Sequence, residues 1–496
     1  MGETLTLERR LANFRTALER AERGPADGAI EPARRRPAAD HAERLAAALG
    51  GEVVRTAAGT YVRVEAASQP LPLDRDRLAR LPGQPPPGVP LVCLDTETTG
   101  LGTATGTYAF LVGLGWWQGD RFRTVQLLLP DQPDEPALLD AVAANIPADG
   151  WLVTYNGRGF DWPLLVTRFR MARHGPPVHA GHLDLLPFVR RIFRHRLADA
   201  RLRTVEEDLL GVRRHGDVEG WEIPGRYLDF LRGGPPSPLV EVARHNAEDV
   251  VSLARLLVHV ESRYGDAERR RSAPPGDLAG FAAAYGRERR HDEALACLDA
   301  ALEAPPTPAL APGRPITWTV LLTTRADAGL GFARPADRDA DLGPPLRNPP
   351  MERQRLLSDR ARLLRRLGRA DDALDAWRDL ALGGGPIAAL AWVEVAKLLE
   401  HRRRDPAGAL SATTSAQALA NRARGVGRPL PRLERELAVR ATRLSRRLQR
   451  SRRDGQRRVS GTLGSGSIDA QVSRTQSRSG SNEQAIVRRS PASALR

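Results

Sequence analysis

Cysteine is nearly absent from this sequence of 496 residues. The two that occur, Cys93 and Cys297, lie far apart and have no cysteine or histidine nearby at the spacing of zinc ligands. Neither a disulfide framework nor a structural zinc site is therefore indicated. This cysteine usage suits a reducing compartment, and we expect a cytoplasmic protein.

Long hydrophobic runs are also missing. No stretch of about 18 apolar residues occurs, so a membrane span is not expected. The first ten residues alternate charged and apolar side chains and lack the apolar core of a secretory signal, so export is not expected either. The hydrophobic fraction of 41% is ordinary for a soluble protein. The length allows about three domains of about 150 residues each.

Lysine is scarce, and arginine supplies nearly all of the positive charge. Lys and Arg total 75 against 60 Asp and Glu, which gives a formal net charge of +15. A polyanionic partner such as DNA or RNA is one interpretation of this excess. The alternative is a compositional bias, since Ala, Gly, Pro and Arg are all abundant, and net charge does not decide between the two.

Changes in composition predict the domain organisation. Residues 1–40 read as a helix followed by a Pro/Arg-rich linker, and residues 41–87 as a small N-terminal α/β extension. A segment rich in proline and glycine at 82–90 then precedes a mixed pattern over 88–265, in which strands come first and helices later. This pattern predicts an α/β domain with a mixed sheet flanked by helices.

The region 276–445 is predicted to be all helical and to contain repeats. Its recurring phrase ends on Leu374 and Leu410, which are 36 residues apart, close to the period of about 34 residues in tetratricopeptide repeats. Such repeats would offer a surface for a protein partner; an irregular helical domain is the alternative. Residues 446–496 are rich in Ser, Arg, Gly and Gln and are expected to form a disordered basic tail.

The strongest local signal is a pair of acidic residues, Asp95 and Glu97, at the end of an apolar strand. Side chains at i and i+2 share one face of a strand, so the two carboxylates are expected to project together while Thr96 faces away. Carboxylates this close repel each other unless a cation lies between them, and such oxygen ligands suit Mg²⁺ or Mn²⁺. A solvated strand end is the alternative.

A second acidic residue follows an Asn156-Gly157 turn. Asp161 stands where a helix begins, with Pro163 in the first turn of that helix. Taken alone, this position favours an N-cap, which contributes about 0.5 to 2 kcal/mol to helix stability.

A third acidic segment lies on a later helix. His245 and Asp249 are one turn apart, so both can face the same site. Taken alone, a helix face that carries solvated charges is the favoured interpretation.

Together the three segments resemble exonuclease motifs I, II and III of the DEDD superfamily. The resemblance implies a ribonuclease-H-like fold and a 3′–5′ exonuclease in which two divalent ions, Mg²⁺ or Mn²⁺, are bound by Asp95, Glu97, Asp161 and Asp249. It also implies His245 as the general base, with one departure. In the two DEDD subgroups this base is a tyrosine four residues before the last aspartate or a histidine five before it, whereas here a histidine stands at four.

The turns beside these motifs supply the candidate substrate contacts. A glycine in such a turn lets a nucleotide approach the backbone closely. The candidate residues are Thr98, Thr99, Gly100, Asn156 and Phe160.

A narrower resemblance follows from His182–Leu186 and Arg214–Tyr227, taken with Leu202 and Glu206. These segments look like YprB-type ribonuclease-H-like proteins, in which tetratricopeptide repeats follow the nuclease domain. Two acidic residues within them, Asp184 and Asp217, fit either a substrate cleft or a buried structural hydrogen bond. We therefore leave both outside the predicted site.

Two other functions remain open from the sequence. One is a nucleic-acid-binding or scaffold protein built on a nuclease fold, because a fold does not establish an activity. The other is a structure-specific endonuclease that uses the same metals. The choice between DNA and RNA also stays open, because recognition of the 2′-hydroxyl leaves no readable motif.

Overall fold

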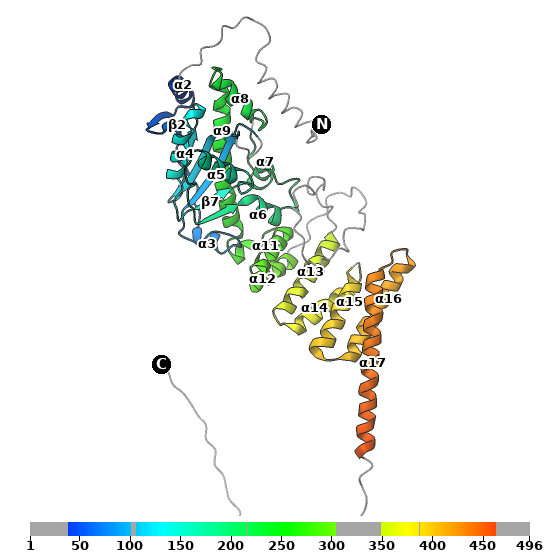
Figure 1. Ribbon diagram of the computed structural model, residues 1–496. Helices are drawn as coiled ribbons and strands as arrows, with labels where there is room; N and C mark the ends of the chain where they lie inside the picture. The colour runs from blue at the N-terminus through cyan, green and yellow to red at the C-terminus, as the bar shows by residue number, and fades with distance from the viewer. Residues whose placement is uncertain (1–37, 101–105, 215, 304–348, 386, 463–496) are drawn as a thin grey trace, which may run out of the picture. The chain divides into compact units, whose positions relative to one another are not determined.

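The computed structural model describes residues 38–100, 106–214, 216–303, 349–385 and 387–462 (Figure 1). The expected helix and linker before residue 38, and the tail from residue 463, lie outside these ranges. The chain divides into two compact units, Met1–Leu398 and Leu399–Arg496. Within the described ranges, no helix is both long enough and apolar enough to cross a bilayer.

A mixed sheet forms the centre of the first unit. Its strands follow the order β1-β2-β6-β5-β4-β7-β8, and β3 pairs with β6 outside this path. Neighbours from β1 to β4 are antiparallel, whereas β7 is parallel to β4 and β8 is parallel to β7. The strand bounds are β1 Glu52–Thr56, β2 Gly59–Glu65, β3 Gln69–Pro70, β4 Leu91–Thr98, β5 Ala109–Gln118, β6 Arg121–Leu128, β7 Trp151–Thr154 and β8 Gly181–Asp184.

The central strands form because their side chains are apolar on both faces of the sheet. Every residue of β5 from Ala109 to Gly115 is buried. Since successive side chains point to opposite faces, both faces are covered there. The long helix α9, Ser237–Tyr264, packs on β4, β5 and β6 and lies along the sheet in Figure 1. This helix and strand β4 together position the candidate site.

The remaining elements of the first unit are helical. Those around the sheet are α2 Ala38–Leu49, α3 Arg75–Ala79, η1 Gln132–Asp134, α4 Glu135–Ala144, α5 Asp161–Met171, α6 Leu185–Ile192, α7 Leu202–Val205, η2 Glu206–Leu210, α8 Ile223–Leu231 and α10 Ala267–Arg270. The helices that follow are α11 Pro275–Arg287, α12 His291–Glu303, α13 Pro349–Arg366, α14 Ala370–Leu382 and α15 Ala388–Leu398. Each consecutive pair from α11 to α15 is in contact. The expected fold, a mixed sheet flanked by helices and then a mostly helical region, is confirmed.

The division into domains differs from the expectation at two places. Strands β1 and β2 belong to the same sheet as the acidic strand β4, and Val62 of β2 shares a core with Ala42 and Leu45 of α2. Residues 41–87 are therefore part of the sheet domain and not a separate extension. The proline- and glycine-rich segment before β4 is a loop within one domain, because turn composition marks a chain reversal and not a boundary.

The expected break between residues 265 and 276 is crossed by a buried polar cluster. The carboxylate of Asp277 in α11 is fully buried and accepts a hydrogen bond from the hydroxyl of Tyr264 over 2.6 Å. It also pairs with Arg196 at 3.0 Å and with the ring of His195 at 3.1 Å. Helix α11 is thus fixed to the sheet domain by charge as well as by packing against α6.

The second unit contains η4 Leu399–Arg403, α16 Pro406–Gly425 and α17 Pro431–Thr462. Residues 446–462, which the composition places in a disordered tail, are therefore helical. Leu437 and Leu444 explain why the helix forms: they lie seven residues apart, both are fully buried, and α17 packs on α16. Arginine and glutamine are good helix formers and extend the helix beyond that contact.

Candidate active site

The structure brings the four predicted carboxylates together. Asp95 and Glu97 lie at the end of β4, Asp161 is the first residue of α5, and Asp249 lies on α9. Burial raises the pKa of Asp95 well above its usual value, and the charges of Asp249, Asp161 and Glu97 raise it further. Residues separated by more than 150 positions thus share one electrostatic site.

Glu97 also has a raised pKa. Burial raises the pKa of its carboxyl, followed by the charges of Asp249, Asp161 and Asp217. Burial also raises the pKa of Asp161, whereas a hydrogen bond from Thr96 opposes the shift. Buried carboxylates that repel one another are costly to ionise without a cation, and a divalent ion is the partner that such oxygen ligands favour.

Asn246 fixes the orientation of Asp95. Its side-chain amide donates to Oδ2 of Asp95 over 2.9 Å, and its Oδ1 accepts from Nε2 of Gln126 over 2.9 Å. Gly113, which pairs with Asp95 across the sheet, allows this approach of α9, because an added Cβ would lie 2.2 Å from Oδ1 of Asn246. The fully buried Asn246 is therefore a positioning residue that the sequence analysis did not single out.

Asp161 and Thr96 differ from the sequence interpretation. The hydroxyl of Thr96 donates to Oδ1 of Asp161 over 2.6 Å, so Thr96 contributes to the site although it was expected to face away from it. The alternation of side chains between the two faces of β4 says which residues share a face. It does not say which other element lies against that face, and here α5 begins beside Thr96. Asp161 is the first residue of α5 and not its N-cap, because the N-cap position is Phe160, which forms no side-chain cap hydrogen bond.

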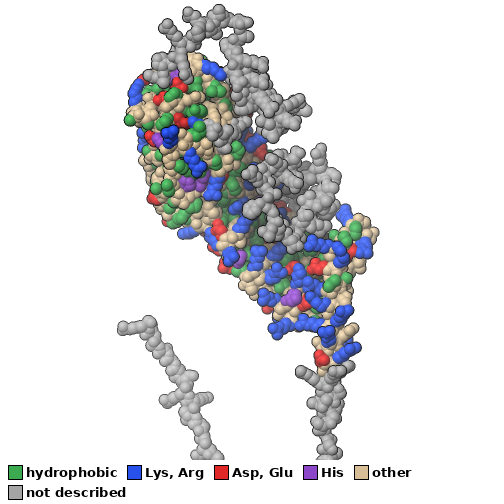
Figure 2. Space-filling model, viewed as in Figure 1, with side chains coloured by type: hydrophobic (Ala, Val, Ile, Leu, Met, Phe, Trp, Pro, Cys, Tyr) green, Lys and Arg blue, Asp and Glu red, His purple; other side chains and the backbone are tan. Residues whose placement is uncertain are grey.

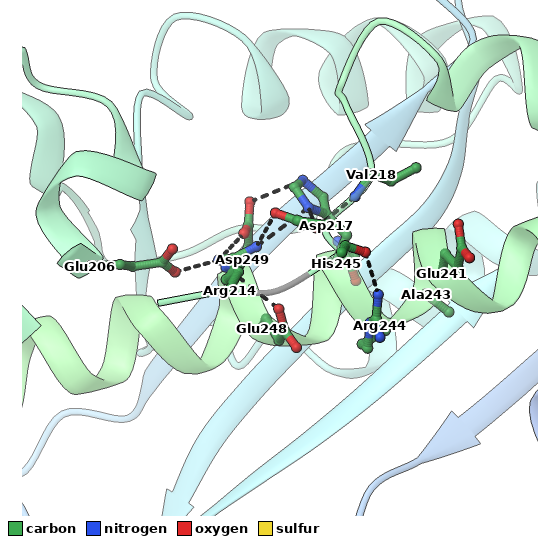
Figure 3. A network of polar contacts seen from close by, with 12 residues as sticks. Glu206, Arg214, Asp217, Val218, Glu241, Ala243, Arg244, His245, Glu248 and Asp249 are labelled. Atoms are coloured by element: carbon green, nitrogen blue, oxygen red, sulfur yellow. Dashed lines mark hydrogen bonds and ion pairs between the residues drawn. The ribbon is translucent and has the colours of Figure 1, made fainter. Parts of the chain in front are cut away.

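Arg214 lies at the centre of a network of polar contacts around Asp249, one of the four carboxylates (Figure 3). Its guanidinium donates to Oδ1 of Asp249 over 2.5 Å and forms a short ion pair with Glu206, whose side chain is fully buried. It also lies 3.5 Å from carboxylate oxygens of Asp217 and Glu248. Although burial disfavours its charge, the carboxylates of Asp249 and Glu206 raise the pKa of Arg214.

His245 is held by a carboxylate at one ring nitrogen. Nδ1 lies 2.7 Å from Oδ1 of Asp217, and Nε2 lies 3.8 Å from Oδ2 of Asp249 (Figure 3). Nη1 of Arg214 lies farther from the same Nδ1, at 3.3 Å. Because an ionised carboxylate only accepts hydrogen bonds, the shorter contact with Asp217 favours the tautomer with the proton on Nδ1, in which Nε2 of the neutral ring is an acceptor. Burial opposes the shift, but the hydrogen bond and charge of His245 and the charge of Arg214 lower the pKa of Asp217.

The remaining predicted residues support turns. Asp184 accepts from the backbone nitrogen atoms of Asn156 at 2.8 Å and of Leu186 at 3.1 Å, so it joins the Asn156-Gly157 turn to α6. Asn156 has a φ of 67°, a left-handed conformation that asparagine tolerates. Asp184 therefore has the structural role that the sequence left open, whereas Asp217 belongs to the site.

The residues proposed to contact substrate lie at the rim of this region. The hydroxyl of Thr98 donates to the carbonyl of Gly100 over 2.6 Å, and that of Thr99 accepts from the backbone nitrogen of Tyr108 over 2.9 Å. Both threonine hydroxyls are therefore engaged with backbone atoms of the described residues next to β4 and β5. The side chain of Phe160 is 53% exposed beside Asp161, so its ring is free to contact another molecule.

The donor set fits divalent metal ions, although its side chains are not yet arranged around one. In the part of the chain that the structure describes, no three His, Cys, Asp or Glu side chains form a ready metal site. Asp249 is turned toward Arg214, and Asp161 toward Thr96. The mutual repulsion of Asp95, Glu97 and their neighbours is the observation that fits cation binding.

The sequence analysis did not place five of these residues in the site: Thr96, Glu206, Arg214, Asp217 and Asn246. Arg214 and Asp217 lie in an irregular loop without periodicity, and their partners are distant in sequence. The fragment around Asp217 carried a usable signal, because it resembles YprB-type proteins and a place in the substrate cleft was one of the two interpretations left open for Asp217. Their residue types are also common on solvent-exposed surfaces, so residue type alone did not identify them as part of a site.

Comparisons with known proteins agree with this geometry. Residues 92–261 match the RNase_H superfamily. The chain is 39% identical over 175 residues to the uncharacterised protein YprB of Bacillus subtilis (strain 168). The aligned part is 35% of this chain and 42% of YprB, so the chain spans less than half the length of that relative. The chain thus carries an RNase_H superfamily domain over residues 92–261.

Proposed function

We propose that this protein is a metal-dependent nuclease that hydrolyses phosphodiester bonds of DNA or RNA. The observation that carries the proposal is the burial of Asp95, Glu97 and Asp161, whose pKa values are all raised, together with the charge of Asp249, which raises the pKa values of Asp95 and Glu97 further. A protein rarely buries uncompensated carboxylates without a use for them, and groups with shifted pKa values cluster at functional sites.

The four carboxylates would hold two divalent ions, Mg²⁺ or Mn²⁺. When bound, such ions lower the pKa of water and stabilise the charge that develops on the leaving oxygen. Asn246 would keep Asp95 in its ligating orientation through the 2.9 Å hydrogen bond, and Thr96 would do the same for Asp161. Asp249 has to exchange the guanidinium of Arg214 for a metal.

His245 would act as the general base. Because Asp217 holds the proton on Nδ1, the lone pair of Nε2 is free to accept a proton from the attacking water. Arg214, once released from Asp249, would stay paired with Glu206 and Asp217, and its guanidinium would then be available to bind a phosphate of the substrate. The resemblance to the DEDD exonuclease motifs supports attack from a 3′ end.

The test is cleavage of end-labelled single-stranded and double-stranded DNA and RNA by the full chain, with Mg²⁺ or Mn²⁺ and with a chelator. We expect metal-dependent release of mononucleotides from the 3′ end, and loss of that activity in Asp95→Asn. The matched control is Asp120→Asn, an exposed aspartate in the turn between β5 and β6. Internal cuts would identify an endonuclease, and binding without cleavage in every condition would identify a scaffold protein.

A further inference from the structure

Helix α17 of the second unit carries a dense run of arginines. No acidic residue occurs from Leu437 to Arg453, whereas seven arginines do. Figure 2 shows Lys and Arg side chains gathered along the visible part of this helix.

Two of the seven arginines have a structural role. Arg440 and Arg443 pair with the buried carboxylate of Glu400 at 2.9 and 2.6 Å, so they compensate a charge inside the second unit. The other five are exposed and form no ion pair or hydrogen bond with any residue in the described ranges: Arg446, Arg447, Arg450, Arg452 and Arg453. These five arginines, which we call the basic segment, are therefore unnecessary for the packing of α17.

Three of the five arginines of the basic segment share one face of the helix. Arg446, Arg450 and Arg453 are spaced by four and three residues, which places them on one side of the helix over a rise of about 10 Å. The buried Leu437 and Leu444 lie on the opposite side, where α17 packs on α16. Like charges this close repel one another, so the arrangement costs stability unless a polyanion binds there.

We propose that the basic segment of α17 binds the phosphodiester backbone of the nucleic acid that the first unit cleaves. The proposal rests on the nuclease function proposed above. A nucleic acid strand offers one negative charge per nucleotide in a regular row, and the planar guanidinium binds phosphate oxygens in pairs. Three arginines in a row on one helix face match that regularity.

A membrane surface fits this segment less well. Helices that lie in a membrane interface need a free apolar face opposite the basic one. In α17 that side is covered by α16 at Leu444, and the positions between Arg446 and Arg453 that are not basic are Leu448, which is half-buried, and the polar Gln449 and Ser451. Nucleic acid is therefore the occupant that the charge pattern favours.

The test measures binding of the full chain to fluorescently labelled single-stranded and double-stranded DNA and RNA, in chelator so that nothing is cut, over a range of salt concentrations. The variant is Arg446→Gln/Arg450→Gln/Arg453→Gln. The matched control removes the same three charges from exposed ion pairs of α13 and α14, as Arg362→Gln/Arg369→Gln/Arg378→Gln.

Each phosphate contact contributes about 0.7 to 0.9 to the steepness with which log affinity falls against log salt concentration. Loss of three contacts in the α17 variant should therefore make this slope shallower by about 2 to 3. The control variant should have the same slope as the wild type. Equal slopes in the two variants would overturn the proposal, as would binding of the wild type to anionic vesicles but not to nucleic acid. Cleavage of a short oligonucleotide with Mn²⁺ is measured separately. If neither the wild type nor either variant cleaves but their salt slopes still differ as expected, the proposed nuclease function is wrong and the proposed binding surface on α17 is supported.

Discussion

Nη2 of Arg214 lies 2.5 Å from Oδ1 of Asp249, so a predicted metal ligand is engaged by a cation of the protein itself. The same guanidinium pairs with the buried Glu206, and Asp217 lies 3.5 Å away. Three carboxylates are thereby compensated by one side chain. Arg214 and a metal ion would compete for Asp249, and this competition can be measured.

Replacing Arg214 should lower the stability of the metal-free protein and raise its affinity for metal ions. In Arg214→Met, Glu206 stays buried without its cation, and breaking such a pair costs about 3 to 5 kcal/mol. We expect a lower melting temperature in chelator, a larger rise on addition of Mn²⁺, and tighter Mn²⁺ binding by calorimetry than in the wild type. Arg213→Met, at an exposed neighbouring position, is the control. Unchanged melting in chelator would mean that the pair contributes nothing.

The stability of the metal-free protein should fall as pH rises. The pKa values of Asp95 and Glu97 lie well above their ordinary values of 3.8 and 4.5, so above about pH 4 the folded state binds more protons than the unfolded chain. The free energy of unfolding then decreases with pH until the raised pKa values are passed. Asp217 contributes to stability with the opposite dependence on pH, because its pKa is lowered in the folded state. Its contribution to the free energy of unfolding is lost only as the pH falls below about 4.

Urea unfolding in chelator at a series of pH values checks this expectation. The midpoint should be higher near about pH 5 than near about pH 8, and the difference should shrink in Asp95→Asn/Glu97→Gln, which removes both titrating groups. Added Mn²⁺ should oppose the trend, since metal ligands bind in their deprotonated form. A wild-type midpoint that rises with pH in chelator would contradict the coupling among these carboxylates.

The boundary of the sheet domain can be tested by truncation. A chain ending at Gly265 loses α11, which leaves Arg196 and Tyr264 without the buried Asp277 and uncovers Phe281's partners in the core. We expect this form to be less stable by about 3 to 5 kcal/mol or to aggregate. A chain ending at Glu303 keeps α11 and α12 and should unfold cooperatively near the midpoint of the full protein. Equal stability of the two truncated forms would restore the boundary expected from composition.

The acidic motifs were predictable because each depends on local geometry. An apolar strand that ends in Asp95 and Glu97 fixes their common face, and one helical turn fixes His245 relative to Asp249. The resemblance to known motifs then joined the segments, which spacing alone could not do. The order and pairing of the strands, by contrast, depend on contacts between distant segments, and so β8 and the inclusion of β1 and β2 in the sheet were missed.

The residues that were missed acquire their roles from contacts with residues that are distant in sequence. Thr96 acquires its role from α5, Asn246 from Gly113, and Arg214 from three carboxylates on η2, α9 and its own loop. None of these partners lies within one strand or one helical turn, where periodicity is informative. Only the part of α17 beyond residue 445 was missed, because the polar and basic composition there was interpreted as a disordered tail.

The last prediction separates the general base from the metal ligands. His245→Ala should lower kcat by about 10² to 10⁴, the usual contribution of a positioned base, while the affinity for Mn²⁺ stays near that of the wild type. Asp249→Asn should instead lose Mn²⁺ binding together with activity, since it removes a proposed ligand. Added imidazole should restore part of the activity of His245→Ala, because the ring of His245 is partly exposed and its removal leaves room beside Asp217.

The control for this rescue is His174→Ala, an exposed histidine paired with Asp140 on the surface. Imidazole should not change its rate, because that ring has no contact with the four carboxylates. Full activity of His245→Ala without imidazole would remove this residue from the reaction. If His245→Ala loses both turnover and Mn²⁺ binding, and imidazole restores neither, then His245 supports the metal site through Asp217 and Asp249, and proton transfer to Nε2 is wrong.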